Sequence, residues 1–259
     1  MPAALVTGAG GRLGRAMAVA LSEQGFDVAV HFASSEAGAQ ETVRMIHEAG
    51  QKAVSLRADL LIEDEMEALV GRAADALGQP LSVLVNSASI FEHDVMGELT
   101  RESWDRHMDS NLRAPVVLTQ AFAAQAPAPM KDAQGEPVAQ ALVVNLIDQR
   151  VRKLTPEFMS YTLAKAALWT FTQTAAQALG ANVRVNAIGP GPTLRGGRQS
   201  EADFAKQRAA TILARGADPD DICAALLYLL NAKSVTGQMI AVDGGQHLAW
   251  ETPDVLDVE

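Results

Sequence analysis

The sequence has 259 residues, 48% of them hydrophobic and 20% charged, and a formal net charge of −10. This length and composition predict one α/β domain, and the negative charge without a lysine or arginine cluster argues against nucleic acid and anionic membranes as partners. No apolar stretch is long enough to span a membrane and no signal-peptide pattern is present, so we expect a cytoplasmic protein. The one cysteine, Cys223, has no companions at ligand spacing, which predicts no metal site.

Apolar runs that alternate with helical segments predict a doubly wound parallel sheet with helices on both faces, in a single domain over residues 1–259. The expected strands cover residues 3–6, 28–31, 53–56, 81–85, 141–145, 183–187 and 239–242.

A glycine-rich turn follows the first expected strand, at residues 7–14 with the sequence TGAGGRLG. A helical pattern begins directly after it. Such a turn lets the backbone approach a pyrophosphate closely, while free N–H groups at the helix start face the phosphate charge. An ordinary tight turn is the alternative, but the position in a first strand–turn–helix unit favours dinucleotide binding.

The end of the second expected strand indicates which dinucleotide binds. NAD enzymes of this fold place an acidic residue there, whereas His31 is followed by residues 32–35 with no acid before Glu36. We therefore expect NADPH, with Ser34 and Ser35 bonding the 2′-phosphate and His31 or Arg12 adding charge. After the third strand, Asp59 and Leu60 are expected to border the adenine, although the aspartate could simply cap the strand end.

Two segments are irregular. Residues 126–140 contain three prolines and a glycine and predict a surface loop. Residues 189–202, GPGPTLRGGRQSEA, are typical of a mobile segment over a ligand pocket, so we expect a flexible substrate loop at about residues 190–215, helical over 203–215. An acidic tail covers residues 250–259.

Tyr161 and Lys165 are four residues apart, with Asp148 thirteen residues before the tyrosine. Side chains at this spacing share one face of a helix. A lysine near a tyrosine favours the phenolate, so we expect a lowered Tyr161 pKa and a phenol able to donate protons at neutral pH. A half-buried tyrosine beside a solvated lysine would give the same spacing.

Together these features resemble the short-chain dehydrogenase/reductase family, because the family's motifs occur here in the same order and at the same spacing. The matching motifs are the glycine turn, Asp59, residues 86–89 (NSAS), Asn111, Tyr161 with Lys165, and residues 189–191 (GPG). The resemblance implies a Rossmann-like fold, a nicotinamide cofactor, a homotetramer, Tyr161 as acid and Lys165 at the nicotinamide ribose. Together with the arguments above, it gives Asp148, Tyr161, Lys165 and Asn111 as the expected catalytic residues. The expected cofactor contacts are Gly8, Arg12, Leu13, His31, Ser34, Ser35, Asp59, Leu60, Asn86, Ser87, Ala88, Lys165, Pro190 and Gly191, although the pteridine reductase branch of this family more often has an arginine among the residues after the second strand.

Two departures from the common family pattern resemble the pteridine reductase branch, which includes bacterial dihydromonapterin and alternative dihydrofolate reductases. Arg12 stands where the second glycine of the turn is usual, and Asp148 replaces the usual serine. By position, the resemblance assigns Arg12 to phosphate and pterin contact, Ser89 to a polar pterin contact and Phe91 to stacking on the pterin ring. The expected substrate contacts are Arg12, Ser89, Phe91, Asp148, Tyr161 and Leu194. Phe91 could equally be a core aromatic residue.

Asp148 also carries an argument of its own. Ketone reduction needs a hydrogen-bond donor at the carbonyl oxygen, which an ionised carboxylate cannot supply. A pterin C=N bond needs a proton at nitrogen, and its aminopyrimidine edge offers donors to a carboxylate. No serine or threonine occurs over residues 143–151 to take the serine's place. The alternative is that Asp148 is merely a strand-end residue.

Three functions fit these patterns. The first is an NADPH-dependent reductase of a dihydropterin or dihydrofolate-like substrate. The second is a carbonyl reductase acting on a 3-oxoacyl or sugar-like ketone, with Asp148 in place of serine. The third is an NADPH-binding sensor without catalysis, against which the intact Tyr161 and Lys165 argue.

Overall fold

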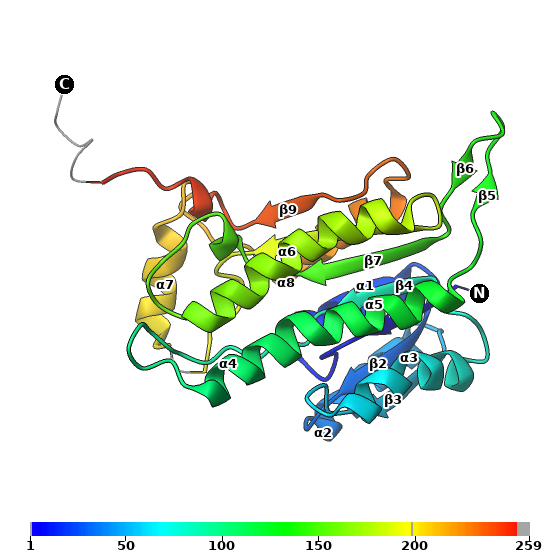
Figure 1. The fold of residues 1–259 in the computed structure, drawn as a ribbon, viewed down its shortest axis with the longest axis horizontal. Helices are drawn as coiled ribbons and strands as arrows, with labels where there is room; N and C mark the ends of the chain where they lie inside the picture. Colours follow the sequence, from blue (N-terminus) through cyan, green and yellow to red (C-terminus); the bar gives the residue numbers. More distant parts are fainter. Residues whose placement is uncertain (1, 198, 253–259) are drawn as a thin grey trace.

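A parallel sheet of seven strands forms the centre of the protein, in the computed structural model that describes residues 2–197 and 199–252 (Figure 1). The strand order is β3–β2–β1–β4–β7–β8–β9. The strands are β1 (Ala3–Val6), β2 (Asp27–Phe32), β3 (Ala53–Arg57), β4 (Val83–Asn86), β7 (Ala141–Leu146), β8 (Val183–Pro190) and β9 (Met239–Val242). This is the predicted doubly wound, Rossmann-like arrangement.

The expected strands are all present, with β1 and β9 at the predicted bounds. The largest difference is in β8, which continues to Pro190 because Pro190 pairs with Val242 of β9. Every residue of β1, β2, β4 and β7 is buried, which explains their continuous apolar character.

Helices cover both faces of the sheet (Figure 1). One face packs against α1 (Arg12–Glu23), α2 (Glu36–Glu48) and α8 (Pro219–Asn231). The other packs against α3 (Glu63–Leu77), α5 (Ala114–Gln125) and α6 (Met159–Leu179). A further helix, α4 (Arg101–Met108), continues through a π-helical turn, η1 (Asp109–Arg113), into α5.

The segment expected to be a surface loop, residues 126–140, contains a small hairpin instead. Strands β5 (Met130–Lys131) and β6 (Pro137–Val138) pair antiparallel and project from the body of the protein (Figure 1). The Asp132 carboxylate closes the turn by accepting from the backbone N–H groups of Gln134 and Glu136. Two-residue strands lack the alternation by which a strand is recognised in sequence.

The loops that follow the carboxyl ends of the strands gather at one edge of the sheet, together with α7 (Glu201–Ala209) (Figure 1). This helix begins and ends earlier than the expected helical range, residues 203–215. Residue 198 of the predicted substrate loop and residues 253–259 of the predicted tail lie outside the described residues. No helix in the described ranges is long and apolar enough to cross a membrane.

Candidate active site

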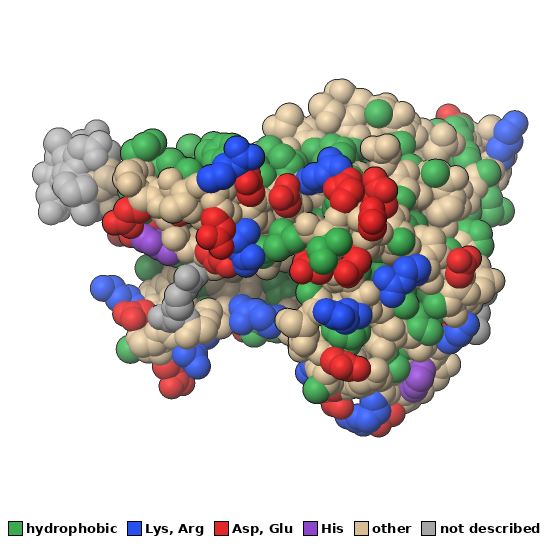
Figure 2. Space-filling view, turned by 60° about the horizontal axis from the view of Figure 1, so that its bottom comes forward, with side chains coloured by type: hydrophobic (Ala, Val, Ile, Leu, Met, Phe, Trp, Pro, Cys, Tyr) green, Lys and Arg blue, Asp and Glu red, His purple; other side chains and the backbone are tan. Residues whose placement is uncertain are grey.

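A cavity of about 630 Å³ opens at the carboxyl edge of the sheet. The space-filling view shows a hollow on this side of the protein, with basic side chains at its rim (Figure 2). The predicted site residues that line the cavity are Gly8, Arg12, Leu13, Ser34, Ser35, Ser87, Ala88, Ser89, Phe91, Asp148, Tyr161, Lys165, Pro190, Gly191 and Leu194. The sequence therefore identified residues that converge from six separate parts of the chain.

The glycine turn has no room for side chains at two positions. A Cβ on Gly8, whose φ is +65°, would lie 2.9 Å from Cα of Ala88, and a Cβ on Gly14 would lie 2.3 Å from the Gly8 carbonyl oxygen. The Thr7 hydroxyl accepts from the backbone N–H groups of Ser87 and Ala88, which ties the ends of β1 and β4 together. The result is a shallow backbone cradle at the start of α1, of the kind that fits a pyrophosphate.

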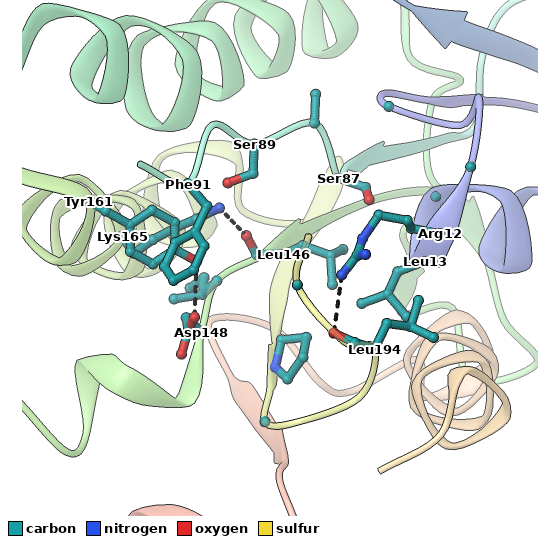
Figure 3. A pocket seen from close by; sticks show the side chains of 18 of the residues that line it. Arg12, Leu13, Ser87, Ser89, Phe91, Leu146, Asp148, Tyr161, Lys165 and Leu194 are labelled. Atoms are coloured by element: carbon teal, nitrogen blue, oxygen red, sulfur yellow. Dashed lines mark hydrogen bonds between the residues drawn. The ribbon is translucent and has the colours of Figure 1, made fainter. Parts of the chain in front are cut away.

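Arg12 occupies a backbone conformation that favours glycine, with φ of +52°. Its guanidinium extends across the cavity and donates to the carbonyl oxygens of Leu194, at 3.2 Å, and Arg195, at 3.0 Å (Figure 3). The side chain thus joins the glycine turn to the predicted substrate loop. A non-glycine residue held in this conformation is a common feature of functional sites.

His31 has a different place from the one expected. It is 1% exposed, accepts from the Gly8 N–H through Nδ1, and donates from Nε2 to the Ala58 carbonyl oxygen. Because Nδ1 accepts a hydrogen bond, the ring carries its proton on Nε2 alone and is neutral, and burial lowers its pKa. The expectation that His31 adds charge to a phosphate is therefore wrong, and the ring instead supports the glycine turn from below.

Three other expected cofactor contacts do not line the cavity. The Asp59 carboxylate accepts from the Leu61 N–H, which is the strand-end cap considered as its alternative, and Leu60 is buried. Asn86 is 2% exposed and donates to the side-chain oxygen of Asn145 on β7. These residues shape the ends of the strands around the cavity.

Tyr161 and Asp148 meet directly inside the cavity. The Tyr161 hydroxyl donates to Oδ2 of Asp148 at 2.9 Å, while Oδ1 accepts from the Arg150 N–H at 2.8 Å and caps a short 3₁₀ turn, η2 (Gln149–Val151) (Figure 3). Burial raises the pKa of Asp148, opposed by the bond from Arg150. Burial and the Asp148 charge raise the pKa of Tyr161 well above its ordinary value. The predicted lowering of the Tyr161 pKa by Lys165 is therefore wrong.

Lys165 lies one helical turn after Tyr161, as predicted, and is 2% exposed. Its ammonium donates to the Leu146 carbonyl oxygen at 2.8 Å and lies 5.7 Å from the centroid of the Tyr161 ring (Figure 3). Burial lowers the Lys165 pKa to about 8, against the attraction of Asp148. Its cation and that of Arg150, which also lines the cavity, both offset an ionised Asp148.

Aromatic rings form one wall of the cavity. Phe91 is 46% exposed, so it is no core residue. One face of its ring stacks on Phe158, with centroids 4.3 Å apart and planes 8° apart, and the Tyr161 ring meets it edge-on at 4.7 Å. The Arg150 guanidinium lies 5.1 Å from the centroid of Phe158. The wall is a layered stack of planar groups beside Asp148.

The Asn111 side chain does not reach the cavity. It sits on η1, is fully buried, and uses both amide atoms on the backbone of Ile90, at 2.8 Å each. The geometry makes Asn111 a residue that positions Ser89 and Phe91, on either side of Ile90, rather than one whose side chain contacts a ligand.

Comparisons with known proteins agree with this geometry. A family model described as enoyl-(acyl carrier protein) reductase matches residues 8–247. The chain is a short-chain dehydrogenase/reductase. It is therefore an oxidoreductase, and the predicted family is confirmed.

Among its relatives of known structure, FolM alternative dihydrofolate reductase 1 from Brucella canis, complexed with NADP, is 42% identical with a TM-score of 0.90, over 98% of this chain and 97% of FolM. The angucycline C-6 ketoreductase LanV with bound NADP is 27% identical with a TM-score of 0.85, over 95% of this chain and 96% of LanV. The 3-oxoacyl-[acyl-carrier-protein] reductase FabG of Staphylococcus aureus is 30% identical over 95% of this chain and 98% of FabG.

The reductase also contains a buried polar cluster that the sequence analysis missed. Asp94 accepts from the N–H of Ser160 at 3.1 Å and from its hydroxyl, and Nδ1 of His107 lies 2.6 Å from that hydroxyl. Asp94 is 3% exposed, and His107 and Ser160 are fully buried. Because α6 has no side-chain cap of its own, Asp94 serves as a cap from another segment, directly before Tyr161. Separations of 13 to 66 residues hid this cluster from the sequence.

Proposed function

We propose that this short-chain reductase uses NADPH to reduce a pterin-type C=N bond, in a dihydropterin or a dihydrofolate-like substrate. The observation that carries the proposal is the direct bond between the Tyr161 hydroxyl and the Asp148 carboxylate, 2.9 Å long, inside the cavity. A carboxylate at this point accepts hydrogen bonds, whereas a ketone oxygen requires a donor. The likeness to FolM supports the same substrate class.

The residues of the cavity fit a nicotinamide dinucleotide. The Gly8 to Gly14 cradle would hold the pyrophosphate, and Ser34 and Ser35 lie on the lining at the end of β2. Lys165 would contact the nicotinamide ribose. When bound, NADPH supplies a hydride. FolM and LanV both have NADP bound in their structures, which supports the choice of cofactor.

Tyr161 and Asp148 form the group that handles protons. Because the pKa of Asp148 is raised, its carboxyl holds a proton at a higher pH than an ordinary aspartate does. The hydroxyl of Tyr161 and that carboxyl share one hydrogen bond, so a proton given up by one is replaced through the other. In this proposal, the pair delivers the proton to the pterin nitrogen, and Lys165 stabilises the charge left behind.

The wall beside this pair suits a flat heterocycle. The Phe91 ring is partly exposed in the cavity and is held by Phe158 on one face, so its position is fixed before a ligand arrives. Aromatic faces bind planar rings by offset stacking. Ser89, Arg12 and Leu194 line the same cavity and supply polar and apolar contacts around the ring.

A ketone substrate is the second candidate, because FabG and LanV are named as ketone-reducing enzymes and match nearly the whole chain. In that case the Tyr161 hydroxyl would turn from Asp148 to the substrate oxygen. The raised pKa of Tyr161 makes it a weak acid for that step while Asp148 is ionised.

The test is NADPH consumption with dihydrobiopterin, dihydromonapterin, dihydrofolate, a 3-oxoacyl thioester and simple ketones as separate substrates. We expect turnover of a pterin and little turnover of ketones. Turnover of ketones alone would contradict the proposal and support the carbonyl reductase. Tight NADPH binding without any turnover would support the sensor.

A further inference from the structure

The end of β2 has no cation of its own for a 2′-phosphate. Ala33, Ser34 and Ser35 line the cavity there, His31 is neutral and buried, and Glu36 adds a negative charge at the start of α2. A phosphate binds most strongly to a guanidinium or ammonium group. If NADPH is the cofactor, as proposed above, the cation has to come from another element.

The register of the sheet brings a cation, Arg57, to the end of β2. Strand β3 runs parallel to β2 with Arg57 opposite Phe32, so Arg57 ends its strand at the edge where the cavity opens. Its Nε donates to the Ala33 carbonyl oxygen at 3.3 Å. This bond holds the guanidinium beside the backbone that carries Ser34 and Ser35.

The guanidinium of Arg57 is otherwise uncommitted. The side chain is exposed, and within residues 2–197 and 199–252 it forms no ion pair with a carboxylate. Only one of its five N–H donors has a partner in the described structure, which leaves both terminal nitrogens available to two oxygens of one anion. A charge without a counter-ion beside a cavity favours anion binding.

Two neighbouring arginines make different contacts. Arg15 is partly buried and donates to the Thr42 hydroxyl and to the carbonyl oxygens of Gly10 and Gly38, which fastens α1 to α2. Arg72, on α3, is exposed as well and donates to the carbonyl oxygen of Arg57. Of these three arginines, Arg57 is the one that bonds to the backbone carrying Ser34 and Ser35.

We propose that Arg57 binds the 2′-phosphate of NADPH and sets the preference for NADPH over NADH, with the Ser34 and Ser35 hydroxyls completing the site. The determinant thus lies on β3, one strand away from the segment in which the family fold places it. The inference depends on the proposed cofactor but not on the proposed substrate.

The test compares wild-type protein with Arg57→Gln, measuring dissociation constants by calorimetry without substrate. We expect Arg57→Gln to weaken NADPH binding about 10- to 100-fold, the value of a charged hydrogen bond, and to leave NADH binding unchanged. The fragment 2′,5′-ADP should weaken in parallel and 5′-AMP should not. Arg57→Lys should retain part of the preference, because it keeps the charge but loses the planar fork.

The matched control is Arg101→Gln, which removes one positive charge from an exposed side chain on α4. It should leave all four affinities unchanged. Unaltered NADH binding shows that each variant is folded. If Arg57→Gln keeps the wild-type ratio of NADPH to NADH affinity, Arg57 is a solvated surface residue and the inference is wrong. If wild-type protein prefers NADH or binds neither dinucleotide, the proposed NADPH function fails as well.

Discussion

The hydroxyl of Tyr161 donates to Asp148 across 2.9 Å, and both side chains face one cavity at the carboxyl edge of the sheet. Neither group has its ordinary acidity, since burial raises the pKa of both. The pair therefore behaves as one proton-holding unit, and variants of either member should affect it differently.

Removing the phenol should disable proton delivery. Tyr161→Phe keeps the ring against Phe91 and deletes only the hydroxyl. We expect kcat to fall by about two to four orders of magnitude, with NADPH affinity unchanged. Steady-state kinetics on the preferred pterin measures this, and a rate close to that of the wild type would show that another group supplies the proton.

Replacing the carboxylate should change the kind of substrate. Asp148→Ser puts a hydroxyl donor where an acceptor stood, so pterin turnover should fall by about two orders of magnitude while ketone turnover appears or rises. The ratio of the two activities in one preparation is the measurement. Asp148→Ala is the control, because it supplies neither an acceptor nor a donor and should lose pterin turnover without gaining ketones.

The rate should depend on the charge of Lys165. Its pKa is lowered to about 8, so the ammonium is present below that pH and is lost as pH rises through it. Because the cation stabilises the charge that proton transfer leaves on Tyr161 and Asp148, kcat should decline above about pH 8. A pH profile checks this, and Lys165→Met, which cannot titrate, should show a low rate without that decline. A wild-type rate that is constant from pH 7 to pH 10 would contradict the assigned role.

Substitutions of Arg12 should affect stability and cofactor binding differently, because its backbone conformation favours glycine while its side chain makes contacts in the cavity. Arg12→Gly relieves the left-handed conformation, and Arg12→Ala does not. Both remove the bonds to Leu194 and Arg195. We expect both variants to bind NADPH more weakly, with Arg12→Gly more stable than Arg12→Ala by about 1 kcal/mol in denaturant unfolding. Equal stabilities would mean that the conformation at this position costs nothing.

The buried cluster of Asp94, His107 and Ser160, at the start of the helix that carries Tyr161, should affect both the stability of the protein and its catalytic rate. In Asp94→Asn, an amide N–H₂ faces donors that a carboxylate oxygen accepted before, which should cost about 1–3 kcal/mol in unfolding free energy. Asp94 fixes the start of α6, which carries Tyr161. We therefore expect a larger decrease in kcat than the change in KM. Asp105→Asn, which alters only an exposed ion pair with Arg101, should leave both unchanged. If Asp94→Asn lowers the stability but leaves kcat unchanged, the cluster of Asp94, His107 and Ser160 stabilises the fold and does not affect the position of Tyr161.

The fold was predictable because most of its strands, β1, β2, β4 and β7 above all, are buried on both faces and form largely apolar runs between amphipathic helices. The cavity residues of the glycine turn and of the other loops were predictable because each of these segments follows a strand. Tyr161 and Lys165 were predictable because their spacing places them on the same face of one helix. The hairpin at β5 and β6 was missed because its two-residue strands leave no period in the sequence.

The wrong predictions about the site have a common cause. The decisive contacts are between residues that are far apart in the sequence and are brought together by the sheet. The role proposed for Arg57 leaves no signal in the sequence, because Arg57 lies on β3 and only the strand register brings it to the end of β2. The acidity of Tyr161 was misjudged because Lys165 is near in sequence, whereas burial and Asp148 dominate in space. His31 is neutral because the backbone of Gly8 and Ala58 takes both ring nitrogens.

The order in which a ribosome delivers the chain has a consequence for the cavity. Gly8 and Arg12 emerge before the residues they lie against, because Ala88 and Leu194 follow roughly 80 and 180 residues later. Gln246, which also lines the cavity, follows later still. A nascent chain therefore cannot form the whole cavity until Gln246 has been synthesised. Ligand binding can stabilise only the finished domain, and the early stages of folding have to proceed without it.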